Sequence, residues 1–192
     1  MLKSKYTILL FIVFGILFLA LVNAKRVPTT DMEPSIQLND LVWLQSKNPR
    51  EGDVVLMLDP HDGERFYLRR VVALEGDSVQ ALPNGAVRIN GKTIRQRDMG
   101  TIEPFRIYQE NSWTSENTPR QYLVQRLIEA PQALPREPQL LPTDTVFVMS
   151  DNRDVAVDSR WWGPIPNELV VGVVVFRLGW SHPWRDHWST AP

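Results

Sequence analysis

The chain has 192 residues, of which 21 are basic and 22 acidic, and it contains no cysteine. This length is sufficient for one or two domains with a substantial hydrophobic core. The balanced charge gives no support for a nucleic-acid partner, and the lack of cysteine excludes disulfide bonds, a thiol nucleophile and thiolate metal sites. Frequent proline and β-branched residues with little helical periodicity predict a mainly β fold.

The first segment, residues 6–24, carries no charged side chain and consists mostly of Leu, Ile, Val and Phe. A helix of this length just spans the roughly 30 Å hydrocarbon core of a bilayer. Lys3 and Lys5 precede the segment, which favours a cytoplasmic N-terminus. We therefore expect a single-pass anchor in the cytoplasmic membrane, with the body on the extracytoplasmic side, either periplasmic or at the cell surface. The alternative is a cleaved signal peptide, because residues 22–24 form an acceptable cleavage pattern.

Short apolar runs separated by turn residues predict β-strands along most of the remaining chain. Pro83-Asn84-Gly85 between two such runs is typical of a hairpin. Between residues 98 and 143 the chain is polar and interrupted by proline, so only two short strands are expected there, at 122–124 and 126–128. The other predicted strands cover residues 40–44, 53–58, 66–74, 78–82, 86–89, 92–95, 145–149 and 169–178.

Three stretches carry motif-like sequence. Residues 27–36 read Val-Pro-Thr-Thr-Asp-Met-Glu-Pro-Ser-Ile, residues 67–77 read Tyr-Leu-Arg-Arg-Val-Val-Ala-Leu-Glu-Gly-Asp, and a third box occupies residues 150–163. In this order and spacing they resemble the type I signal peptidases, a family known for a serine nucleophile and a lysine general base. The resemblance covers about residues 6–178. It implies a two-lobed, mainly antiparallel β fold with an N-terminal transmembrane helix.

The same resemblance implies a division of the chain into four parts. A tail and membrane anchor at 1–24 would precede a core β lobe of the catalytic type, which combines 25–80 with 144–180. A second β lobe, at 81–143, would be inserted between the two halves of the core. The Trp-rich tail at 181–192 would either lie at the bilayer interface or be disordered.

At the family's catalytic positions, this chain has residues that differ from those of the family. The nucleophile position is Asp31 where the family has serine, and the general-base position is Arg69 where it has lysine. A serine that supports the lysine falls on Ala156, whereas Thr29 matches the position of a side-chain oxyanion donor. Because an arginine guanidinium stays protonated in proteins, Arg69 cannot act as a general base. The replacements therefore predict a member of the family without peptidase activity.

The charged replacements suggest a specific contact. We hypothesise that Asp31 and Arg69 form an ion pair where the catalytic dyad would lie, because the resemblance places these positions within hydrogen-bonding reach. The alternative is two separately solvated charges. Other charges in the motifs are expected to form structural salt bridges rather than a catalytic cluster: Arg70, Asp151, Arg153, Asp154, Asp158 and Arg160.

The resemblance also indicates a substrate cleft, in which an extended peptide adds as a strand and small side chains enter shallow apolar pockets. The alternative for the matching residues is ordinary core packing. The residues at these positions are Val27, Pro28, Met32, Ile36, Tyr67, Leu68 and Val71.

Other chemistries have weaker support. Thr30, like Thr29, is a possible substitute nucleophile but has no base nearby in the sequence. A Ser-His-Asp triad would need His61, in a predicted turn, or His182 and His187, in the tail. These histidines lack the spacing of metal ligands, so neither a metal nor another cofactor is expected.

These observations imply a membrane-anchored protein of the secretion machinery. Its expected partners are the lipid bilayer and signal peptides or exported precursor proteins, with a secretion or surface-assembly protein as a further possibility. The replaced dyad predicts that it binds such partners without cleaving them. The alternative is an active signal peptidase that removes signal peptides from secreted precursors by an altered dyad.

Overall fold

A computed structural model describes residues 24–83, 85–112, 120–130 and 137–179. In these ranges the regular structure consists of fourteen β-strands, one short α-helix and one 3-10 turn, and every strand ladder is antiparallel. The predicted mainly β, antiparallel fold is confirmed. The expected anchor at 6–24 and the Trp-rich tail lie outside the described residues, except for residue 24. Within the described ranges, no helix is long and apolar enough to cross a membrane.

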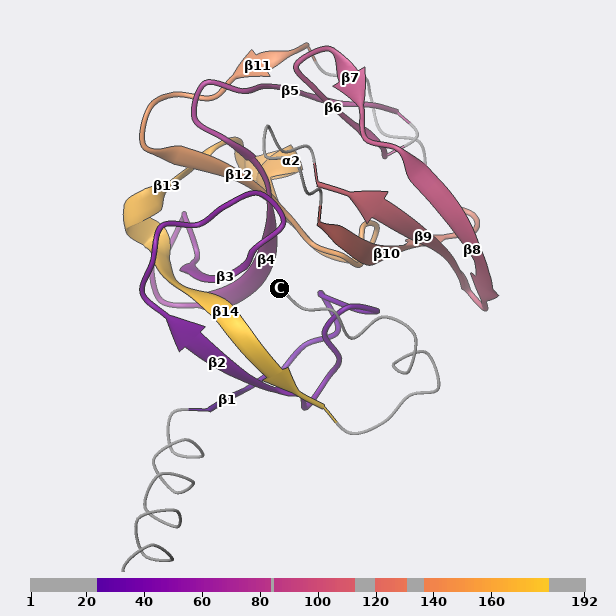
Figure 1. The fold of residues 1–192 in the computed structure, drawn as a ribbon, viewed down its shortest axis with the longest axis horizontal. Helices are drawn as coiled ribbons and strands as arrows, with labels where there is room; N and C mark the ends of the chain where they lie inside the picture. Colours follow the sequence, from indigo (N-terminus) through magenta and orange to yellow (C-terminus); the bar gives the residue numbers. More distant parts are fainter. Residues whose placement is uncertain (1–23, 84, 113–119, 131–136, 180–192) are drawn as a thin grey trace, which may run out of the picture.

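The largest sheet has seven strands and is drawn from the two ends of the described chain (Figure 1). The last long strand of the described chain lies between strands that come from its beginning. In spatial order the strands are β1 (Lys25–Arg26), β2 (Leu41–Gln45), β14 (Val170–Leu178), β3 (Val54–Leu58), β4 (Phe66–Leu74), β12 (Thr145–Met149) and β13 (Ile165–Pro166).

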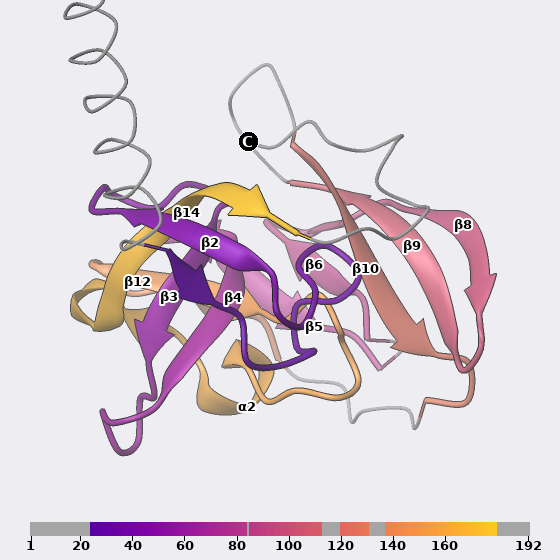
Figure 2. The same ribbon diagram turned by 90° about the horizontal axis from the view of Figure 1, so that it is seen from below.

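Two smaller sheets come from the middle of the chain, and Figures 1 and 2 show the three-stranded one to one side of the seven-stranded sheet. That sheet contains β10 (Gln121–Leu127), β9 (Phe105–Asn111) and β8 (Gln96–Ile102) in spatial order. The four-stranded sheet contains β11 (Gln139–Leu140), β5 (Ser78–Ala81), β6 (Val87–Ile89) and β7 (Lys92–Thr93).

The strand predictions find the long strands of the large sheet but miss its two short edge strands, β1 and β13, and they are incomplete for the middle of the chain. Strands β4 and β12 have the expected bounds, and β5 and β6 pair as the expected hairpin. The hairpin of β8 and β9 was not predicted, because β8 is polar, mostly exposed and held by its hydrogen bonds to β9. The two short strands expected at 122–124 and 126–128 are one strand, β10, because the polar Gln125 between them is buried within it.

One hydrophobic cluster fixes the first motif against the large sheet. Val27, Met32 and Ile36 pack with residues of β2, β3 and β4, and all three are almost fully buried. Burial of an apolar side chain of this size contributes about 1.5–3 kcal/mol. The loop between β1 and β2, which carries Asp31, is therefore anchored on both sides of that residue.

The third motif follows β12 and ends in helix α2 (Ser159–Trp162). The side chain of Asp158 caps this helix by accepting a hydrogen bond from the backbone amide of Arg160, the usual role of aspartate at this position. The Ser159 hydroxyl accepts a hydrogen bond from the Val148 amide at 3.0 Å, within the buried interior. These contacts fix the loop of residues 150–158 between β12 and α2.

Candidate functional site

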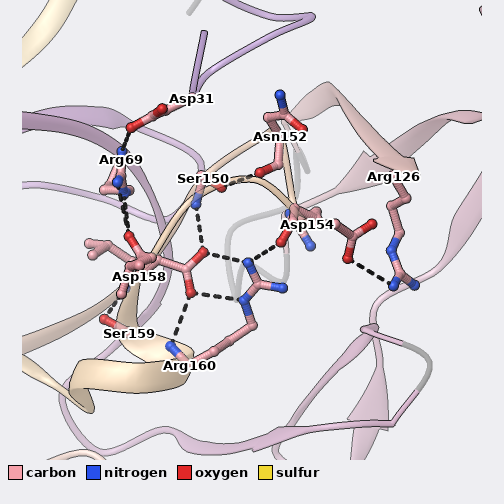
Figure 3. Close-up of polar contacts among 12 residues, drawn as sticks. Asp31, Arg69, Arg126, Ser150, Asn152, Asp154, Asp158, Ser159 and Arg160 are labelled. Atoms are coloured by element: carbon pink, nitrogen blue, oxygen red, sulfur yellow. Dashed lines mark hydrogen bonds and ion pairs between the residues drawn. The ribbon is translucent and has the colours of Figure 1, made fainter. Parts of the chain in front are cut away.

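Asp31 and Arg69 face each other across the first two motifs (Figure 3). Nη1 of Arg69 lies 3.0 Å from Oδ2 of Asp31. The side chain of Arg69 is 1% exposed and that of Asp31 is 21% exposed. The hypothesised ion pair is present, so the alternative of two separately solvated charges is wrong for this structure.

Backbone carbonyls hold the guanidinium of Arg69 as firmly as the carboxylate does. Nη1 donates to the Leu68 carbonyl at 2.6 Å, and Nε and Nη2 both donate to the Val157 carbonyl, at 3.2 and 2.9 Å. The Cζ atom also lies 4.8 Å from the centre of the Tyr67 ring and 5.8 Å from that of Trp162, within the range of cation–π attraction. The Arg69 head group is thus fixed at its edges and over its faces.

The acceptors of Arg69 include a residue next to Ala156. Ala156 has no polar side-chain atom, and the carbonyl of the following residue, Val157, accepts the hydrogen bonds instead. This contact could not be predicted from the sequence, because every residue carries the same backbone carbonyl acceptor. The role of Trp162 was also missed, since an aromatic residue in a motif has many possible contacts.

Asn152 positions the loop that carries Asp31. Its backbone amide donates to the Asp31 carbonyl at 2.9 Å, and its side-chain Nδ2 donates to the Thr30 carbonyl at 3.3 Å. The side chains of Thr29 and Thr30 are exposed at the same loop. The third motif therefore contacts the backbone of the first motif as well as the Arg69 side chain.

Arg70, the next residue on β4, makes a different ion pair. Its Nε and Nη2 atoms bind both carboxylate oxygens of Asp151, at 2.8 and 2.6 Å, and Nη1 donates to the Gly52 carbonyl at 2.7 Å. Its Cζ atom lies 4.2 Å from the centre of the Tyr122 ring. Burial, the largest single influence, lowers the pKa of Arg70, but the charge and the hydrogen bonds of Asp151, together with Tyr122, outweigh it, and the net pKa is raised.

The remaining charges of the third motif also have ion-pair partners. Arg153 pairs with Glu110 of β9 through two hydrogen bonds, and both side chains are 1% exposed. The Asp158 carboxylate accepts from Nε and Nη2 of Arg160, at 2.8 and 2.7 Å (Figure 3). Asp154 forms an ion pair with Arg126 at 3.2 Å, and its carboxylate also accepts a hydrogen bond from the Leu127 amide at 2.9 Å.

The positions matched to a substrate cleft are mostly buried. Five of them lie in hydrophobic clusters of the interior, as the core-packing alternative requires: Val27, Met32, Ile36, Leu68 and Val71. Pro28 is exposed and Tyr67 is partly buried beneath Trp162, with ring centres 5.5 Å apart. Among these seven residues, only Pro28 and Tyr67 have substantial accessible surface.

The histidine-based alternatives gain no support from the described part of the chain. His61 lies in the exposed turn between β3 and β4, with Nδ1 3.5 Å from Oδ1 of Asp59. His182 and His187 fall outside the described residues. Across the ranges that the structure describes, no three His, Cys, Asp or Glu side chains gather in a way that could hold a metal ion.

Residues 2–180 match a family described as signal peptidase, peptidase S26. A signal peptidase I of Pseudomonas fluorescens is 26% identical, with coverage of 91% of this chain and 73% of the relative. A signal peptidase I of Pseudomonas aeruginosa is 27% identical, with coverage of 88% and 72%. A crystal structure of a signal peptidase I from Enterococcus faecalis is 24% identical over 67% of this chain and 98% of that one, with a TM-score of 0.41. The family match spans nearly the whole sequence, and the chain therefore belongs to the signal peptidase family, peptidase S26.

Proposed function

We propose that this chain is a membrane-anchored, non-hydrolytic signal peptidase homologue that binds exported precursor proteins or a partner in secretion or surface assembly. The observation that carries the proposal is the Asp31–Arg69 pair with its surrounding hydrogen bonds. Hydrolysis by this family's chemistry needs a nucleophile and a base that takes its proton. At these two positions the chain has a carboxylate and a guanidinium that neutralise each other.

The absence of a base is the strongest chemical argument for the proposal. A guanidinium that is protonated and hydrogen-bonded to three acceptors cannot remove a proton from a nucleophile. A carboxylate in Asp31's place would be a weak nucleophile towards an amide and would have no acid to protonate the leaving amine. The hydroxyl of Thr29 could still polarise a carbonyl, but this alone does not cleave a peptide bond.

The direct test is cleavage of a standard signal-peptide precursor by the detergent-solubilised full chain. We expect no cleavage by the wild type and cleavage by the triple variant Asp31→Ser, Arg69→Lys, Ala156→Ser, which restores the family's residues at three positions. A wild type that cleaves at a rate comparable to that of the triple variant contradicts the proposal. An unchanged rate for Asp31→Ala would then direct attention to Thr29 and Thr30.

The second candidate function is an active signal peptidase that removes signal peptides from secreted precursors. It is favoured by the relatives, which are named signal peptidase I and are similar along most of their length. The cleavage assay separates the two functions, because an active enzyme must release a shortened product.

We also propose that residues 6–24 are a retained anchor and that the body lies outside the cytoplasmic membrane. The length and apolar composition of the segment support this placement. Mass spectrometry of the membrane-extracted protein provides the test. Retention predicts the mass of the whole chain, whereas cleavage after Ala24 predicts a product that starts at Lys25 and is released by an alkaline wash.

A further inference from the structure

Among the described residues, one side of strand β4 has no neighbouring strand over part of its length. Strand β3 pairs with β4 along Phe66–Arg70, and β12 pairs with the opposite side along Arg70–Leu74. Because β12 ends at Met149, opposite Arg70, no described strand continues the ladder on that side. The first half of β4 therefore has an open edge where a further strand could add.

The backbone of Leu68 points to this open edge. The Val71 amide donates to the Asp53 carbonyl, and the Val71 carbonyl accepts from the Gly52 amide, both at 2.8 Å, so Val71 points towards the β3 side. Hydrogen-bonding groups of successive residues in a strand point to alternate sides. Val71 and Arg69 thus direct their backbone groups to β3, and Leu68 directs its own to the opposite side.

The head group of Arg69 binds the backbone acceptor at this edge. Its Nη1 takes the Leu68 carbonyl at 2.6 Å, while Nε and Nη2 take the carbonyl of Val157, in the loop that follows β12. The guanidinium thereby spans two backbone acceptors on segments far apart in the sequence. An added peptide would need the Leu68 acceptor for its own hydrogen bonds.

Several contacts hold the head group in this position. The Cζ atom of Arg69 lies over the ring of Tyr67, within cation–π range, and the ring of Trp162 lies at the outer limit of that range. Asp31 accepts the remaining hydrogen bond shown in Figure 3, and the Arg69 side chain is 1% exposed. An incoming strand would have to displace a buried, charged and hydrogen-bonded group.

We infer that Arg69 is an edge plug, an intramolecular contact that closes β4 to strand addition at Leu68. The resting chain does not receive an extended peptide at this edge. On the binding function proposed above, on which this consequence rests, the exported partner is held at a different surface. The replacement at position 69 thus removes the base and also closes the adjacent backbone acceptor.

The test compares peptide binding by the wild type and by the double variant Asp31→Asn, Arg69→Met. The variant removes the donors of Arg69, keeps an apolar side chain in its place and leaves no unpaired charge. Fluorescence anisotropy of a fluorescein-labelled synthetic signal peptide, added to detergent-solubilised full chain, measures the Kd. We expect the double variant to bind at least tenfold more tightly than the wild type.

A matched control is the double variant Asp98→Asn, Arg106→Met, which makes the same chemical change at an exposed pair. Its Kd should equal that of the wild type. If the Asp31→Asn, Arg69→Met chain loses the native tryptophan fluorescence, the double variant Asp31→Asn, Arg69→Leu replaces it with the same tenfold criterion.

The outcomes separate the edge plug from the proposed function. Equal Kd values for the wild type and the Asp31→Asn, Arg69→Met variant, or no binding by either, overturn the edge plug. Neither result bears on hydrolysis, so the proposed function stands if the wild type also fails to cleave the precursor. Cleavage by the wild type overturns the proposed function, while the ratio of Kd values still decides the edge plug.

Discussion

Arg69 and Arg70 are consecutive on β4 and each guanidinium binds a carboxylate, but the two carboxylates lie at different depths. Successive side chains of a strand point to opposite faces of the sheet. Arg69 reaches Asp31, which is 21% exposed, by one hydrogen bond. Arg70 reaches Asp151, which is fully buried, by two parallel hydrogen bonds.

The difference in burial distinguishes the Arg70–Asp151 pair, a structural contact of the interior, from the Arg69–Asp31 pair of the candidate site. The Arg70 pair joins β4 to the third motif in the interior, where the bidentate geometry compensates for the loss of water around both charges. The Asp31 carboxylate keeps contact with solvent, and Arg69 depends on the carbonyls of Leu68 and Val157 as much as on the ion pair. We therefore expect the two neighbouring arginines to contribute unequally to stability.

The largest expected effect is that of Asp151→Ala. This change leaves the guanidinium of Arg70 buried without a counter-charge, which typically costs about 3–5 kcal/mol. Urea-induced unfolding of the full chain, followed by tryptophan fluorescence, measures the loss. A decrease in unfolding free energy below about 1 kcal/mol would show that the interior pair is not the stronger of the two.

Asp31→Ala should destabilise the chain less, by about 1–3 kcal/mol. The reason is that Asp31 is partly solvated, and Arg69 retains two carbonyl acceptors after the change. Loss of one partner of a fully buried pair would typically cost about 3–5 kcal/mol. The same unfolding measurement applies, and a loss equal to that of Asp151→Ala would remove the contrast between the pairs.

The sequence predicted the strands that bury their own side chains. Strand β12 is almost entirely apolar, and β4 is apolar on both sides of Arg69 and Arg70, so their bounds could be predicted from composition and turn residues. Strand β8 exposes most of its side chains, and its stability comes from pairing with β9, which leaves no hydrophobic pattern to detect. The expected interruption at residue 125 is wrong, because Gln125, although polar, is buried in β10 and forms an isolated β-bridge with Asn152.

The site was predictable where it depends on side chains placed by the family resemblance. The pairing of Asp31 with Arg69 followed from that placement. The carbonyls of Leu68 and Val157 could not be predicted, because a backbone acceptor has no signature in the sequence. The pairing of Arg153 with Glu110 was also unpredictable, since Glu110 comes from a strand that was itself missed.

A smaller effect is expected for a contact that serves both arginines. The Ser159 hydroxyl satisfies the buried Val148 amide and fixes the end of the loop that supplies Asp151 and Val157. Ser159→Ala leaves that amide without its acceptor, a loss of about 1–2 kcal/mol in unfolding free energy. The control is Ser46→Ala at an exposed position, which should cause no measurable change. Equal unfolding curves for the Ser159 and Ser46 variants would contradict the role of this hydroxyl.

The smallest effect is expected at the surface, where Asp98 and Arg106 form a pair that provides the baseline for both buried arginines. Their charged groups are 3.8 Å apart, and the side chains are 55% and 49% exposed. Solvent screens such a pair, and ordering two flexible side chains offsets most of the attraction, so Asp98→Ala should change the unfolding free energy by less than about 0.5 kcal/mol. Unfolding at low and high salt checks the cause, since a screened surface pair loses even this small contribution in salt. A loss as large as that of Asp31→Ala would mean that depth of burial does not rank the ion pairs of this protein.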